Sequence, residues 1–526
     1  KQVKCFPQYL RSAGYYCSNN YKKDYNFTDI NVWDESSQTA HWRKRKPGQP
    51  FFSVVNFTST HQGQINGSDE EFFTKYCSKL KPEELHDPAR VPLPPYYPDT
   101  PIVRKIWTRY YDLITFMDKQ VGDLLGQLKD DGLADNTIVF FFADHGLGVP
   151  RHKRTLYDSG LHVPLMIRFP ARYQNLAPLK AGRKIDRLVS FVDFAPTVLS
   201  LAGLPKPNYM QGRAFLGGQA GLEREYVFGA ASRVDEVYEL SRCVRDKRYK
   251  YIRNYMPHLP YVQPSEYPDR ADIMKELRRV VKEGTLTDTQ KLFWQPVKPL
   301  EELYDTLADP HEIHNLADSA QHRHILERMR KVHRKWMADS FDIGLLPEGQ
   351  MHIQAEGSTP YKIARDPGKY PQQRILEVAE LVNKGPAVLP KLIELLEDSD
   401  AGVRYWAAVA ISTLDDETGP ATAALTKALT DENPVVRFVA AGALCKLDLC
   451  ENALPVLAKG LKDRRETVVL HAAREIQSIG NKARPITGQI KQAQAACKEP
   501  DGTYKNNNHA MFIDWALKYA LQNCQQ

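Results

Sequence analysis

The residues best suited to chemistry stand in one short segment, Thr137 to Phe169. Its β-branched and aromatic start, Thr137 to Phe142, predicts a buried strand that ends directly in Asp144, His145 and Gly146. Ligands bind at the carboxyl ends of strands in open α/β sheets, so this Asp and His stand where such a sheet does its chemistry. A carboxylate beside an imidazole suits a hard divalent cation, with the imidazole as a further metal or substrate contact.

Cationic side chains follow this pair. The run Arg151-His152-Lys153-Arg154 offers charges suited to an anion, and Asp158-Ser159-Gly160 then predicts a turn into a second strand, Val163 to Phe169. A metal and a cationic pocket at adjacent strand ends predict an anionic substrate, sulfate or phosphate.

The elements that must position these residues alternate along the first part of the chain. Residues 1–225 read as strands and helices in turn, which predicts an α/β sheet covered by helices. Apolar residues recur at three- and four-residue steps from Ile102 to Leu128, which predicts one long helix that stops near Gly132.

A second, smaller module is expected over residues 226–345. Its α+β character comes from three candidate strands, Glu225 to Ala230, Cys243 to Arg253, and Leu303 to Tyr304. Residues 346–368 are rich in Gly, Pro and charge, which indicates a linker.

The remaining segment, residues 369–526, is repetitive. Segments 389–414, 421–447 and 453–479 are similar to one another, and each predicts a helix, a turn and an Ala-rich helix. Equivalent residues recur 33 apart: Val403, Val436 and Val469, and likewise Ala407, Ala440 and Ala473. The pattern resembles an all-α HEAT-like solenoid, capped by a last helix over His509 to Gln522.

The segment Asp144-His145-Gly146, with a following Lys and a Gly160-x-x-x-Pro164, resembles the sulfatase family of the alkaline-phosphatase-like superfamily. Further marks of that family occur in the same order along the chain: Gly14-Tyr15 with Lys22, Pro50-Phe51-Phe52 with His61, Asp193-x-x-Pro196-Thr197 with Gly212-Arg213, and Glu302-Leu303-Tyr304-Asp305 with Asp309-Pro310-x-Glu312 and Asn315-Leu316. They cover residues 1 to about 340, and each alone is weak. The resemblance implies an alkaline-phosphatase-like domain with a mostly parallel central sheet and a C-terminal α+β subdomain.

The resemblance also implies roles for particular residues. Asp144 and His145 are expected to bind one divalent cation, by resemblance Ca²⁺. Lys153 is expected to contact the sulfate and the leaving-group oxygen, with His152 as an alternative substrate contact. His61 should hydrogen-bond the sulfate or protonate the leaving group.

Lys22 is expected to stabilise the formylglycine side chain. The sequence departs from the family pattern around it, because Tyr21 stands where Gly often precedes the Lys and Asp24 where a His often follows. Asp24 and Asn26 are therefore alternative members of the site, and Lys23 is an alternative to Lys22.

Substrate recognition is expected from a more distant segment. Arg233-Val234-Asp235-Glu236 is similar to RxDE segments that border the substrate in carbohydrate sulfatases. An Arg fork suits carboxylate or sulfate, and Arg233, Asp235 and Glu236 are the candidate substrate contacts. Surface ion pairs are the competing interpretation.

The family's nucleophile motif, C/S-x-P-x-R, is absent from the sequence, and in the segment from Cys5 to Arg11 the Arg falls two places late. The modified formylglycine is therefore expected in a segment upstream of Lys1. On this interpretation the chain is the C-terminal part of a longer sulfatase and is inactive by itself.

Composition sets the remaining bounds. The chain has 526 residues, of which 42% are apolar and 26% charged, and its net charge is +7. The mild charge predicts no nucleic-acid partner, and without an apolar run near 18 residues no membrane span is expected.

Family resemblance implies an exported protein that acts on a sulfated carbohydrate, either a glycan or a glycosaminoglycan. The solenoid is expected to support the substrate groove or a protein partner. Two alternatives are a phosphodiesterase or phosphonate hydrolase of the same superfamily, and a catalytically inactive sulfatase-like binding protein.

Overall fold

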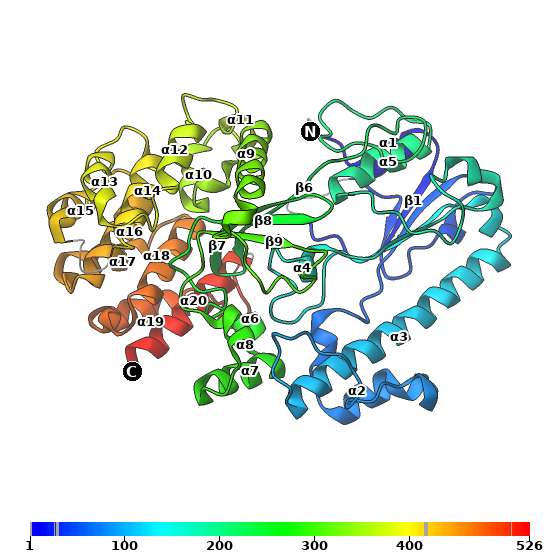
Figure 1. Cartoon of the computed structure of the whole chain (residues 1–526), viewed down its shortest axis with the longest axis horizontal. Coiled ribbons are helices and arrows are strands. Elements are labelled where there is room, and N and C mark those ends of the chain that lie inside the picture. Colours follow the sequence, from blue (N-terminus) through cyan, green and yellow to red (C-terminus); the bar gives the residue numbers. More distant parts are fainter. Residues whose placement is uncertain (1–2, 26, 28–30, 415–418, 506–507, 526) are drawn as a thin grey trace. The chain divides into compact units, whose positions relative to one another are not determined.

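The computed structural model describes residues 3–25, 27, 31–414, 419–505 and 508–525 (Figure 1). They fall into two compact units. The first comprises residues 1–153, 157–228 and 245–248, and the second comprises residues 154–156, 229–244 and 249–526.

A parallel three-stranded sheet lies in the first unit. β1 (Tyr16–Asn20) is its middle strand, with β2 (Glu35–Ser36) on one side and β3 (Phe51–Val55) on the other. Buried Cys17 of β1 packs with Leu10 of α1 (Phe6–Ser12) and Leu199 of α5 (Phe194–Leu201). The predicted α/β architecture is therefore confirmed, with helices packed against parallel strands.

A second, two-stranded sheet in the same unit differs from the expected pattern. β4 (Val139–Phe142) pairs antiparallel with β5 (Leu165–Arg168), in the register Phe140 to Ile167. The strand predicted as buried is only half-buried, and Phe142 at its end is 42% exposed. Because the two strands are antiparallel, the segment from Ala143 to Pro164 connects their neighbouring ends on one side of the sheet.

The long helix of the first unit agrees with its prediction. α3 (Pro101–Asp130) begins at Thr100, whose side chain accepts a hydrogen bond from the Val103 amide at 3.3 Å. It ends before Gly132, which has a φ of +68°. Ile106, Tyr110 and Leu113 form its buried face, and the C-terminal half is more exposed.

A four-stranded sheet opens the second unit, in the order β6-β7-β8-β9. Its strands are β6 (Val227–Val234), β7 (Val237–Arg245), β8 (Tyr249–Asn254) and β9 (Glu301–Asp305). The predicted strand from Cys243 to Arg253 is in fact parts of two strands, because residues 246–248 form a turn between them. Beside the sheet, the ammonium of Lys250 lies 3.1 Å from the carboxylate of Glu312, with both side chains 1% exposed. The DP-x-E segment therefore serves the fold here.

The repetitive segment forms paired helices as predicted. The first pairs are α13 (Leu389–Leu395) with α14 (Ala401–Ile411) and α15 (Thr422–Ala428) with α16 (Pro434–Lys446), followed by α17 (Cys450–Gly460) with α18 (Glu466–Ser478). All six repeat residues from the 33-residue spacing are buried. Arg404 links consecutive repeats, because its guanidinium donates to both carboxylate oxygens of Asp431 at 2.7 and 2.9 Å.

The expected linker is helical and packed. α10 (Glu348–Gln354) and α11 (Pro360–Ile363) occupy it, and Ile363 is 1% exposed in the same hydrophobic core as the repeats. Just before it, the carbonyl of Leu345 accepts a hydrogen bond from the indole of Trp406 at 2.8 Å. Gly, Pro and charged residues are typical of a linker, but apolar side chains between them, such as Met351, pack against the core.

The last helix, α20 (Asn508–Gln525), packs against α18 and α19 (Thr487–Ala495), as expected of a cap (Figure 1). It also returns to the α+β part of the second unit, where Lys518 pairs with Glu266 at 2.7 Å. The other helices are α2 (Asp69–Lys75), α4 (Asp158–Leu161), α6 (Glu266–Asp269), α7 (Asp272–Glu283), α8 (Asp288–Lys291), α9 (Arg323–Ser340) and α12 (Gln372–Ala379). Over the described ranges, none of the helices is both long and apolar enough to pass through a lipid bilayer.

Candidate active site

Five predicted site residues come together in the first unit. Lys22 follows β1 and His61 follows β3, so both stand beyond the carboxyl ends of parallel strands. Desolvation lowers the pKa of His61 from its ordinary value, and the charges of Lys153 and Lys22 lower it further. Asp144 raises this pKa and His145 lowers it slightly, so all four residues act on one imidazole. The result is a cluster of two ammonium groups, two imidazoles and one carboxylate.

Two glycines bring the Asp144 loop to His61. A Cβ on Gly148 would lie 2.4 Å from the side chain of Gln62, the residue after His61, and 2.8 Å from the hydroxyl of Tyr110. Gly146 donates its amide to the carbonyl of Gly160 at 2.9 Å, where a Cβ would meet the Ser159 carbonyl at 1.8 Å. At both positions two segments of the backbone approach so closely that only glycine fits.

His61 has a defined tautomer. It precedes the short 3₁₀ helix η2 (Gln62–Ile65), and its Nδ1 accepts a hydrogen bond from the amide of Gly63 at 3.3 Å. An Nδ1 that accepts is unprotonated, so Nε2 carries the proton of the neutral ring. The lowered pKa favours that neutral form. His61 is therefore set up to donate one hydrogen bond through Nε2.

Asp144 and His145 fit part of a metal coordination sphere. Nδ1 of His145 lies 2.7 Å from the carbonyl of Gly146, which leaves Nε2 as the lone-pair donor, 3.7 Å from Oδ2 of Asp144. Two donors about 2.4 Å from one cation at roughly right angles are about 3.4 Å apart, close to that separation. Within the described residues, however, no group of three His, Cys, Asp or Glu side chains is arranged to hold a metal. Two donors fall short of the about six to eight ligands of Ca²⁺.

Lys22 is held in place by contacts with two nearby residues. Its ammonium pairs with Asp24 at 3.1 Å, and its carbonyl accepts a hydrogen bond from the side chain of Asn19 at 3.2 Å. Asp24, one of the two alternative site residues, is thus the ion-pair partner of Lys22. Asn26, the other, lies outside the described residues. Sequence reasoning missed Asn19, which is buried at the end of β1 and is bonded in turn by Asn56 at 3.2 Å.

The basic run divides into separate environments. Arg151 has a φ of +64°, and its guanidinium lies over the rings of Tyr96 and Tyr157 at 4.3 and 3.9 Å. His152 is 7% exposed and packs among Tyr96, Tyr97 and Trp107. Such burial among rings is typical of a structural side chain, and a contact of His152 with substrate stays a prediction. Lys153 remains with the His61 cluster.

The segment Arg233 to Glu236 belongs to the second unit and forms the turn between β6 and β7. Arg233 pairs with Glu348 at 2.8 Å, and Asp235 pairs with Arg154 at 3.1 Å. Glu236 is fully buried, where its carboxylate accepts the amide of Glu266 at 2.7 Å. Glu236 is buried, and Arg233 and Asp235 each take part in an ion pair. A role of these three residues in substrate recognition stays a prediction.

Taken together, the first unit is an α/β domain in which two lysines, two histidines and one aspartate that follow its strands act on one another. Comparison with known proteins identifies the family. Residues 4–204 match the family model described as Sulfatase, and residues 145–301 match that of the N-sulphoglucosamine sulphohydrolase C-terminal region. Residues 360–444 match HEAT repeats, which confirms that prediction. The chain belongs to the sulfatase family.

Individual relatives agree with this assignment. The chain is 41% identical over 391 residues to an ulvan-active sulfatase of Formosa agariphila, covering 69% of this chain and 65% of that protein. It is 27% identical over 324 residues to the human N-sulphoglucosamine sulphohydrolase, covering 56% of this chain and 62% of that protein. The chain therefore spans less than two thirds of the length of either relative.

One solved structure that resembles the chain holds a protein in complex with its substrate D-glucosamine-2-N,6-O-disulfate. The two are 16% identical with a TM-score of 0.44, covering 64% of this chain and 82% of that one.

Proposed function

We propose that this protein removes sulfate from a sulfated carbohydrate and that the cluster around His61 binds the sulfate group. The observation that carries the proposal is the convergence of Lys22, Lys153 and His61 with Asp144 and His145. A sulfate ester has one negative charge and several acceptor oxygens. Two ammonium groups and a neutral Nε2–H donor supply the matching charge and hydrogen bonds.

Each residue has its own part in the proposal. Lys153 holds the sulfate and stabilises, or protonates, the leaving-group oxygen as the S–O bond breaks. His61 donates from Nε2 to a sulfate oxygen, which fits its neutral tautomer better than transfer of a proton. Lys22, oriented by Asp24, stabilises the family's formylglycine nucleophile.

Asp144 and His145 are proposed to supply two of the ligands of one divalent cation, Ca²⁺ by family resemblance. When bound, that cation would polarise the sulfate group as a Lewis acid. Because Nδ1 of His145 is bound to the Gly146 carbonyl, only Nε2 is directed for this purpose.

The proposed substrate is a polysaccharide. Support comes from the relatives, because one is described as active on ulvan and another as a sulphohydrolase of N-sulphoglucosamine. Export follows as part of the same proposal, since such polymers lie outside the cell or in degradative compartments.

The test is sulfate release by the product of the complete gene, made in a host that installs formylglycine. Ion chromatography would follow ulvan oligosaccharides and N-sulphoglucosamine, and phosphate release from a phosphonate monoester and a phosphodiester would be measured alongside. We expect sulfate release to be the faster reaction and to be lost in His61→Ala. Faster turnover of the phosphorus substrates would favour the phosphonate hydrolase, and a folded but inactive product would favour the binding protein.

A further inference from the structure

A groove begins beside His61 and has no role in the site described above. It lies between η2 and α2, has a volume of about 680 Å³, and is lined on one side by Gly63, Gln64 and Asn66. Glu71 and Lys75 line the other side. The volume falls within the range of small-molecule sites. The amide of Gly63, at one end of the groove, donates to Nδ1 of His61 at 3.3 Å, so this end lies two residues along the chain from the His61 cluster.

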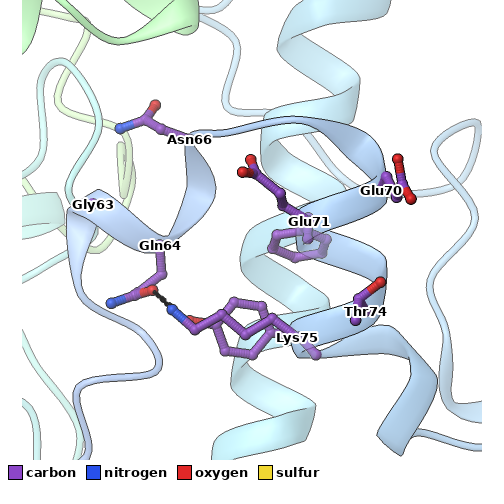
Figure 2. A pocket seen from close by; sticks show the side chains of 9 residues that line it. Gly63, Gln64, Asn66, Glu70, Glu71, Thr74 and Lys75 are labelled. Atoms are coloured by element: carbon purple, nitrogen blue, oxygen red, sulfur yellow. Dashed lines mark hydrogen bonds between the residues drawn. The ribbon is translucent and has the colours of Figure 1, made fainter.

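Polar side chains from the two sides of the groove are hydrogen-bonded to one another. Lys75 donates to Oε1 of Gln64 at 2.7 Å, and the hydroxyl of Tyr76 donates to the same oxygen at 2.5 Å. Figure 2 shows this contact joining η2 and α2, with the amide nitrogen of Gln64 directed away from α2. Glu71 extends from α2 toward the side of η2, where its carboxylate accepts the amide of Ser68 at 2.9 Å.

These groups match a hydroxyl-rich ligand. Amides, carboxylates, a threonine hydroxyl and an ammonium give closely spaced donors and acceptors, the pattern that pairs with sugar hydroxyl groups. The nearly buried rings of Phe72 and Tyr76 supply an apolar floor.

The charges of the groove differ in sign from those of the His61 cluster. Glu70 and Glu71 both line it, against the one ammonium of Lys75. Two carboxylates beside one cation repel a sulfate group, whereas the neighbouring cluster attracts one.

We infer that this groove binds the unsulfated sugar unit next to the sulfated one, and that Glu70 and Glu71 disfavour a second sulfate there. The inference rests on the proposed function, because it assigns the His61 cluster to the sulfated unit. It names the substrate as a chain in which a sulfated sugar is linked to an unsulfated neighbour.

The test measures ligand binding by the chain made in a bacterial host. Asn66-Gly67-Ser68 fits the N-glycosylation pattern, and in such a host Asn66 carries no glycan that could fill the groove. Ligand-observed saturation-transfer NMR would follow two probes, desulfated ulvan oligosaccharide and glucosamine 6-sulfate. We expect Gln64→Ala to weaken oligosaccharide binding about tenfold, the size of one lost hydrogen bond at the upper end, and to leave the monosaccharide unaffected. Lys153→Met should do the reverse.

The controls separate the two proposals. Lys79→Met removes a nearby exposed lysine that does not line the groove and should change neither probe. Circular dichroism would show whether Gln64→Ala folds. If it does not fold, Thr74→Val at an exposed groove position takes its place. Equal binding of the desulfated oligosaccharide by wild type and both groove variants would overturn the inference. Failure of the proposed function would show instead as monosaccharide binding that Lys153→Met does not alter.

Charge exclusion has its own variant. Glu70→Gln combined with Glu71→Gln keeps the acceptor that Ser68 needs and removes both charges. We expect binding of an oversulfated ulvan oligosaccharide to strengthen about fivefold, in the range of exposed charge pairs. Unchanged binding would refute the exclusion of a second sulfate.

Discussion

Oδ2 of Asp144 lies 3.7 Å from Nε2 of His145, and the other nitrogen of that imidazole is bound to the Gly146 carbonyl. Because a carbonyl only accepts, Nδ1 carries the proton of the neutral ring, which leaves Nε2 with the lone pair beside the carboxylate. Two residues adjacent in sequence thus place two candidate metal donors side by side.

Metal affinity should depend on both side chains. For the product of the complete gene, we expect Asp144→Asn to remove the increase in thermal stability that Ca²⁺ gives and to lower sulfate release by about 100-fold. Differential scanning fluorimetry with and without Ca²⁺ checks the binding part independently of turnover. A Ca²⁺ response that survives in both Asp144→Asn and His145→Ala would place the metal elsewhere.

Lys153 should matter far more than an ordinary surface lysine. Lys153→Met is expected to lower kcat for sulfate release by about 100-fold or more, because a positioned proton donor contributes that much. Lys180→Met is the matched control, since this exposed lysine lies in the same unit. Steady-state kinetics on both variants decide the matter, and equal rates would remove Lys153 from the site.

Gly148 should be intolerant of any side chain. Gly148→Ala would force its Cβ to within 2.4 Å of Gln62, and we expect a loss of about 1–3 kcal/mol in the free energy of unfolding. Gly122→Ala is the control. It lies within α3 with no atom within 4 Å of the added Cβ, so it should stabilise slightly. Urea denaturation measures both, and equal stability would mean that the Gln62 contact yields easily.

Stability should fall in mild acid because of buried histidines. His333 is 2% exposed, and burial lowers its pKa from 6.5 to about 3, helped by the charges of Arg253 and Arg242. Between those values the unfolded chain binds a proton that the folded chain does not. The contribution to stability is therefore complete above pH 6.5 and declines as the pH falls toward about 3.

The size of that effect can be measured. From pH 6.5 to pH 5 this histidine alone should lower the free energy of unfolding by about 2 kcal/mol. Half-buried His258 and buried His471, with pKa values lowered to about 3 and about 4, act in the same direction. Urea denaturation across this range should show a shallower pH dependence in His333→Leu than in wild type. An identical slope in the two proteins would show that His333 is protonated in the folded state.

The sequence alone indicated the elements whose patterns are local. Three features could be predicted from the sequence: the period of α3 with its glycine stop, the 33-residue repeat, and the order of the family motifs. Helix periods can be predicted because burial of one helix face imposes a spacing on neighbouring residues. Asp144-His145 was found for the same reason, as it directly follows a run of strand-forming residues.

Only the tertiary structure decided which basic and acidic residues share a site. His152 and Lys153 are neighbours in sequence, yet one is packed among aromatic rings and the other joins the cluster at His61. The packing of residues 346–368 and the burial of Glu236 were likewise invisible, because no short-range pattern records contacts made with distant elements. Side-chain environment depends on what the rest of the chain brings against a residue, and that is set by packing, whereas helix and strand periods are set by the backbone itself.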